Sequence, residues 1–106
     1  MISAILIAAL LQTAAINNQR DKFIACLKGA EATAKAQKMA PEALEPQLRQ
    51  TCAAAEESFR SSLVAFDLKN KVARKLAIAD ANVQIDDFIS GTVEHYKKDR
   101  ARGERG

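Results

Sequence analysis

The sequence predicts an all-α fold, in which an antiparallel helical hairpin over about residues 18–38 and 41–66 is continued by a long C-terminal helix over about residues 68–98. The composition favours helices, because the 106 residues include only four glycines and two prolines. No segment shows the sustained alternation of apolar and polar residues that marks a half-buried strand. The placement of two cysteines further predicts a disulfide between the arms of the hairpin. A chain of this length has room for one domain.

The first fifteen residues have the composition of a secretory signal. Residues 1–11 carry no charge, with Ser3 as their only polar side chain, and small residues follow at Ala14 and Ala15. This arrangement predicts an export signal over residues 1–15, cleaved near Ala15, and a mature protein that is periplasmic in a bacterial-type envelope or secreted. The apolar run is shorter than the roughly 20 residues of a membrane span. Because no Lys or Arg precedes it, an uncleaved anchor and a buried N-terminal helix stand as alternatives.

The helix over residues 18–38 is predicted from its start and from its period. Asn17 and Asn18 are both good N-cap residues. The apolar positions then recur every three or four residues, at Phe23, Cys26, Leu27, Ala30 and Ala34. Pro41 suits the first position of the next helix, so the turn is expected just before it. Pro46 has no N–H to donate, which predicts either a kink there or a helix that begins at this proline.

Two apolar stripes follow. The first has helical spacing and predicts the helix over 41–66; its members are Leu44, Leu48, Cys52, Ala55, Phe59, Leu63 and Phe66. The second begins at Val72, Leu76, Ala79 and Val83, then changes phase and continues at Ile85, Phe88, Ile89, Val93 and Tyr96. Residues 47–90 contain no Gly or Pro, which is typical of a coiled-coil-like rod. Residues 41–98 are therefore expected to form one helix, or two that join near residues 67–70.

The two cysteines are placed symmetrically about the expected turn, because the midpoint between Cys26 and Cys52 is Met39. Residues equidistant from the turn of an antiparallel hairpin lie opposite each other, and each cysteine also falls on the apolar stripe of its own helix. Position and direction together bring the α-carbons within the roughly 7 Å that a disulfide spans. The bridge would close a loop of 25 intervening residues. The alternative is a pair of reduced cysteines that pack as small apolar residues.

No residue is predicted to catalyse a reaction or to hold a cofactor or metal. Two thiols alone do not complete a tetrahedral metal site, and a redox dithiol is expected as C-x-x-C. The single histidine, His95, is interpreted as an exposed helical residue, since no recognised motif places Ser, Asp or Cys beside it. No Glu-x-x-His motif supports a di-iron bundle. We therefore expect a protein that is not an enzyme.

The last apolar residues of the chain form a candidate interface, which consists of Val83, Ile85, Phe88, Ile89, Val93 and Tyr96. The helix over 18–38 is too short to cover the chain beyond about residue 70, so another surface must bury them. The C-terminal helix can fold back to make a three-helix bundle, pair with a second copy of the chain, or receive another envelope protein. Self-association, or binding to such a partner, is the leading functional hypothesis.

The net charge is concentrated at the C-terminus. Residues 97–106 hold five basic and two acidic side chains, and their net charge of +3 equals that of the whole chain. Because the body is neutral, no nucleic-acid-binding face is expected. The helical domain is assigned to residues 16–98, and residues 99–106 to a basic, disordered tail. In the alternative function, the tail attaches the protein weakly to an anionic membrane; its candidate contacts are Lys97, Lys98, Arg100, Arg102 and Arg105.

Overall fold

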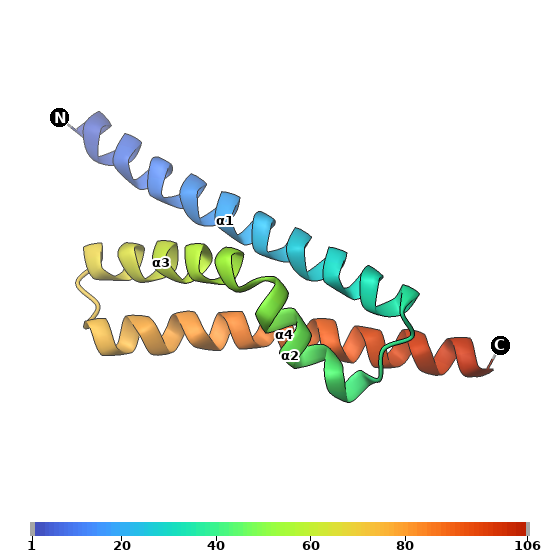
Figure 1. Ribbon diagram of the computed structural model, residues 1–106. Coiled ribbons are helices and arrows are strands. Elements are labelled where there is room, and N and C mark those ends of the chain that lie inside the picture. The colour runs from blue at the N-terminus through green and yellow to red at the C-terminus, as the bar shows by residue number, and fades with distance from the viewer. Residues whose placement is uncertain (1, 106) are drawn as a thin grey trace.

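Residues 2–105 of the computed structural model form four α-helices and no strand: α1 (Ile2–Ala36), α2 (Pro41–Thr51), α3 (Ala53–Lys69) and α4 (Arg74–Arg105) (Figure 1). The structure describes the backbone of these residues and the side chains of residues 13–103. The all-α class predicted from the sequence is confirmed. Met1 and the side chains of residues 2–12, which make up most of the predicted export signal, lie outside the described part of the chain.

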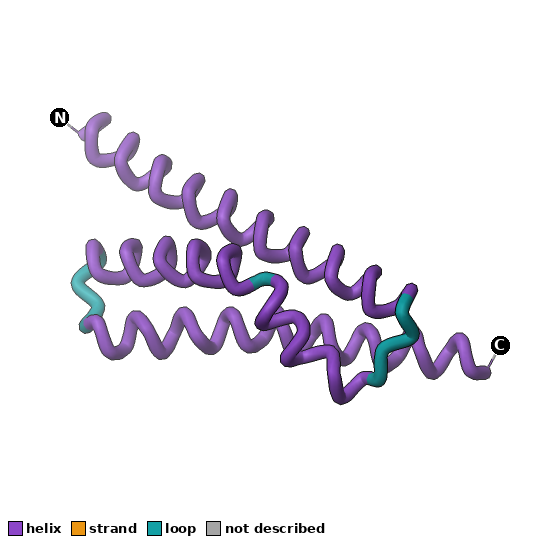
Figure 2. The backbone as a smooth tube through the Cα atoms, in the orientation of Figure 1, coloured by secondary structure: helices purple, strands orange, loops and turns teal. Residues whose placement is uncertain are grey.

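The helices form an elongated bundle in which the chain reverses direction twice. α3 packs against both α1 and α4, while α2 packs against α1 and α4 (Figure 2). The bundle measures 61 × 26 × 21 Å. α1 diverges from α3 toward its N-terminus (Figure 1). α4 is therefore a third arm that folds back along α3 and α2, and it does not continue them as a rod.

Each reversal follows a helix that ends in a left-handed residue. Lys38, with φ 55°, follows α1, and Lys71, with φ 65°, follows α3. At the second reversal the Lys71 N–H donates to the Leu68 carbonyl at 3.1 Å, and the Val72 N–H donates to the Asp67 carbonyl at 2.9 Å. The same pair of bonds closes α1. This is the Schellman arrangement, in which the left-handed position is usually glycine. Because the chain reverses direction here, the alternative of one continuous helix over residues 41–98 is wrong.

A break at Cys52 separates α2 from α3. Cys52 has φ −103° and ψ 18°, yet its N–H still bonds the Leu48 carbonyl at 2.9 Å and its own carbonyl accepts from Glu56 at 2.8 Å. The two axes diverge at this point (Figure 2). The prediction of one helix over 41–66 is therefore wrong. The alternative in which a helix begins at Pro46 is wrong as well, because α2 begins at Pro41 and contains Pro46.

The core lies between the three arms, and every helix contributes to it. Its buried side chains are Ile16, Phe23, Leu27, Ala34, Leu44, Leu48, Cys52, Phe59, Leu63, Ala77, Ala81, Ile85, Ile89 and Tyr96. The rings of Phe23, Phe59 and Phe88 pack together with their centroids between 5.8 and 6.2 Å apart, a spacing that favours tilted and edge-to-face contacts. Ile16 is the first buried residue among the described side chains, because residues 13–15 are exposed.

Candidate functional site

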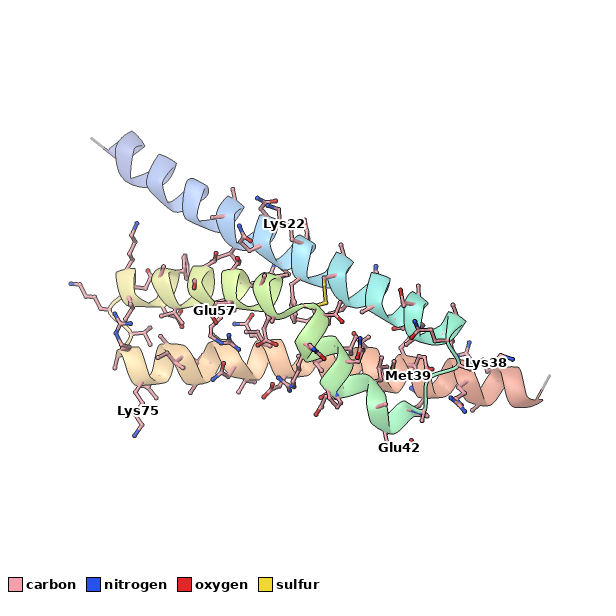
Figure 3. The ribbon with its side chains drawn as sticks, viewed as in Figure 1. Lys22, Lys38, Met39, Glu42, Glu57 and Lys75 are labelled. Atoms are coloured by element: carbon pink, nitrogen blue, oxygen red, sulfur yellow. A yellow bond between two sulfur atoms is a disulfide. The ribbon has the colours of Figure 1, made fainter. Side chains whose placement is uncertain are left out.

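The two cysteines lie at disulfide distance. Their Sγ atoms are 2.10 Å apart and their α-carbons 5.8 Å apart, and the bond joins α1 to the break between α2 and α3 (Figure 3). Cys52 is buried, whereas Cys26 is partly exposed on α1. The symmetric positions of the two cysteines about Met39, each on an apolar stripe, were thus enough to predict this pair. The bridge constrains α1, α2 and α3 but leaves α4 to be held by noncovalent contacts.

The structure places five of the six candidate interface residues against the chain's own core. Ile85, Ile89 and Tyr96 are buried, and Phe88 and Val93 are partly buried against them. These five side chains are therefore not a free surface, because α4 folds back after the second reversal. Two polar contacts accompany this packing: they run from Arg60 Nε to Asn82 Oδ1 at 2.8 Å and from Arg49 Nη2 to Asp86 Oδ1 at 2.9 Å.

Val83, the sixth candidate, points away from the bundle. Val83 is 59% exposed, and Leu76 is 61% exposed. Leu76, Ala79 and Val83 recur at spacings of three and four, so they line one side of α4, and we name them the outer strip. At about 100° per residue, this side lies opposite the buried Ala77 and Ala81. The change of phase after Val83 was the sequence signal that two stripes occupy two different sides of one helix.

Charged residues border the outer strip on both sides. Lys75 and Asp80 are both exposed and lie on opposite flanks of the strip at helical spacing. The Lys75 side chain points away from α3 (Figure 3). Further along the same side of α4, the exposed residues are polar and include Asp86, Asp87, Ser90 and Glu94. The apolar surface therefore ends at Val83.

A polar cluster joins the C-terminal half of α1 to that of α4. His95 Nδ1 lies 2.6 Å from Glu31 Oε1, and His95 Nε2 lies 3.7 Å from Asp99 Oδ2. Lys35 Nζ donates to the same Asp99 oxygen at 2.7 Å. That hydrogen bond raises the pKa of Lys35 and lowers the pKa of Asp99. Sequence reasoning missed the cluster because 64 residues separate Glu31 from His95; only the spacing of four between His95 and Asp99 was a signal.

Residues 99–105, which were predicted to belong to a disordered tail, instead form the last part of helix α4, which ends at Arg105. The first of these residues are held to the bundle, since Asp99 pairs with Lys35 and Arg100 Nη1 donates to the Met39 carbonyl at 2.6 Å. The Tyr96 hydroxyl donates to that carbonyl too. The turn after α1 is therefore held by α4, and the helix runs past the expected boundary at residue 98.

The basic residues of the tail do not gather on one side. Lys97 Nζ lies 3.6 Å from Glu94 Oε1, and Arg100 contacts the turn after α1. Lys98 and Arg102 are exposed one turn apart, and the side chain of Arg105 lies outside the described part. Contact with an anionic membrane through this tail stays a prediction.

The chain matches no protein-family model, no curated protein and no solved structure. Among the described residues, the helices lack any stretch with the length and apolar character to cross a bilayer.

Proposed function

We propose that this chain is a small exported protein that acts without catalysis, by binding to a second copy of itself through the outer strip of α4. In this proposal the disulfide-closed hairpin and the α4 arm form one rigid body, and the outer strip is its binding surface. The observation that carries the proposal is the exposure of Leu76 and Val83, which lie seven residues apart on the side of α4 that faces away from the core. Export is inferred from the apolar residues 1–11 and the small residues that follow.

The spacing of the outer strip matches a coiled-coil seam. With Leu76 and Val83 at a positions, Ala79 takes the d position between them. The small Ala79 side chain would allow the two helices to approach closely. Removing Leu76 and Val83 from water supplies the driving force, which is about 1.5–3 kcal/mol for a fully buried side chain of this size.

The flanking charges favour a parallel dimer. In a parallel coiled coil, a g residue of one helix faces the e residue five positions later on its partner. Lys75 and Asp80 are at g and e, so each Lys75 would face Asp80 of the other copy. An antiparallel pair that opposes Leu76 to Val83 would instead bring the two Asp80 carboxylates together. We therefore expect a parallel pair with two symmetric ion pairs.

The outer strip is short, so the dimer is expected to be weak. A stable interface commonly buries about 1,600 Å² in total, whereas the strip supplies two large apolar side chains and one alanine per copy. Association should therefore appear as a concentration-dependent rise in mass, fully reversible on dilution.

Sedimentation velocity over a concentration series tests the dimer. The double variant Leu76→Asp, Val83→Asp should stay monomeric at concentrations where the native chain associates. Gln84→Asp is the matched control, because it adds a carboxylate at an exposed position of the same helix off the strip. A native chain that stays monomeric at every concentration, or a double variant that associates equally well, would disprove the proposal.

A charge exchange tests the parallel orientation. Lys75→Asp alone should weaken association, because it places two carboxylates in the position of each ion pair. The combined exchange Lys75→Asp, Asp80→Lys should restore association. Failure of the combined exchange to restore it would contradict the parallel arrangement while leaving the strip itself intact.

The export part of the proposal has its own measurement, the intact mass of the protein recovered from its host. Loss of residues 1–15 is the expected result. A full-length mass would contradict cleavage.

A further inference from the structure

We propose that Glu31, His95 and Asp99 form a binding site for a divalent transition-metal ion such as Zn²⁺. One potential ligand atom from each of the three residues lies within 4.8 Å of the other two. An imidazole nitrogen with carboxylate oxygens is a donor set that Zn²⁺ accepts in proteins. The site requires the folded bundle, because Glu31 is on α1 whereas His95 and Asp99 are one turn apart on α4.

The three side chains lie close to the separations found in a zinc centre. Zinc–nitrogen and zinc–oxygen bonds of about 2.0–2.2 Å place two ligands of a tetrahedral ion roughly 3.4 Å apart. His95 Nδ1 lies 2.6 Å from Glu31 Oε1, and His95 Nε2 lies 3.7 Å from Asp99 Oδ2. The two carboxylates lie beside different imidazole nitrogens and only one nitrogen would bind the ion, so the side chains would turn to bring three ligands to a single ion.

The surroundings already stabilise a cation at this place. The Lys35 ammonium group lies 2.7 Å from Asp99 Oδ2, so a cation already contacts one of the three candidate ligands. The Lys35 side chain is 56% exposed, and it can therefore turn into solvent when an ion binds. Removal of Lys35 should strengthen metal binding, since the ion then displaces no ion pair.

The site is open on one side. The Glu31 side chain is only 14% exposed, whereas that of His95 is 63% exposed. A groove of about 440 Å³ between α1 and α4 borders both residues. Three protein ligands with one open position leave room for a water molecule on the ion.

Competing ligands are few in this chain. His95 is the only histidine in the sequence, and both cysteines are joined to each other in the structure. Tight zinc binding by the oxidised protein is therefore expected to require His95 as a ligand. This makes the proposal testable with single substitutions.

Isothermal titration of untagged, oxidised, full-length protein with Zn²⁺ is the test. We expect one ion per chain, together with a higher melting temperature, because the ion would cross-link α1 and α4. His95→Ala should weaken binding by about a hundredfold, and Glu31→Gln or Asp99→Asn by about tenfold or more. Lys35→Met should tighten binding. Glu94→Gln is the control, since Glu94 adjoins His95 in sequence but contacts Lys97, and its affinity should stay within about twofold of the native value.

Circular dichroism shows whether each variant is folded. If a variant fails to fold, the native protein still decides the question, because zinc should shift the ring-proton resonances of its single histidine. Stoichiometric binding with loss in His95→Ala supports the site. The absence of binding at millimolar zinc, equal binding by His95→Ala, or unshifted His95 resonances at saturating zinc would overturn it. These results do not depend on the outer strip, so this proposal and the dimer can fail separately.

Discussion

Reduction of the bond between Cys26 and Cys52 is expected to lower the free energy of unfolding by about 3.5 kcal/mol. The two residues are 26 positions apart. For a loop of this size, the chain-entropy model gives an unfolded-state entropy loss of about 12 cal/mol/K, which corresponds to the free energy above at 25 °C. The bond also holds α1 at the break between α2 and α3.

Urea unfolding followed by far-ultraviolet circular dichroism measures this effect in the presence and absence of a phosphine reductant. Free energies extrapolated to water should be compared, because reduction also expands the unfolded chain and changes the slope. The double variant Cys26→Ala, Cys52→Ala is the control. Its stability should not respond to the reductant and should lie near or below that of the reduced native chain, since the substitution also removes the buried Cys52 sulfur.

Two results would refute the reasoning. An unchanged free energy of unfolding after complete reduction, verified by thiol mass labelling, would show that the loop was already constrained. A loss well beyond about 5 kcal/mol would exceed the chain-entropy contribution and would assign the effect to native packing around Cys52.

Three further substitutions probe the bundle. Phe59→Ala removes a fully buried ring that contacts Phe23 and Phe88 and should cost about 3–5 kcal/mol in urea unfolding; a loss below about 1 kcal/mol would contradict the close packing of the three rings. Tyr96→Phe deletes the donor to the Met39 carbonyl and should cost about 1–2 kcal/mol, with faster amide exchange around the first reversal as a second measure. Lys71→Gly relieves a left-handed residue at φ 65° and should raise the thermal midpoint through a gain of about 1 kcal/mol; a lower midpoint would show that the lysine is not strained there.

Much of the architecture could be predicted from local pattern. Helical spacing identified the residues that pair across the core, such as Phe23 and Phe59. The positions of Cys26 and Cys52 about Met39 were enough to predict that the two residues pair, because a turn fixes the register of an antiparallel hairpin. These features depend on periodicity and on one reversal, both of which are local properties of the chain.

Other features depend on packing between distant segments and could not be predicted. The break at Cys52 occurs without Gly or Pro, so no local residue marks it. The fold-back of α4 was one of three alternatives open from the sequence, and the choice among them depends on the Schellman turn at Lys71, a residue type that rarely takes a left-handed conformation. The cluster of Glu31, His95 and Asp99 arises only once that arm has returned. The second apolar stripe has the helical spacing that was predicted for it. Its later residues, from Ile85 on, lie in the core, whereas Leu76 and Val83 are exposed.

The position of Ile16 has a consequence for the protein after the proposed cleavage. Among the described side chains the core begins at this residue, so removal of residues 1–15 would take away none of that core. It would, however, turn the interior of α1 into a helix start, where the first four N–H groups lose their acceptors. Asn17 and Asn18 would then be placed where asparagine caps a helix best, and Asp21 would face the positive end of the helix dipole. In the uncleaved chain Asn17 Oδ1 accepts a hydrogen bond from Arg20 at 2.9 Å. After cleavage the Asn17 side chain would be able to cap the new helix start. Maturation would thus change the role of Asn17 from a surface contact to a helix cap.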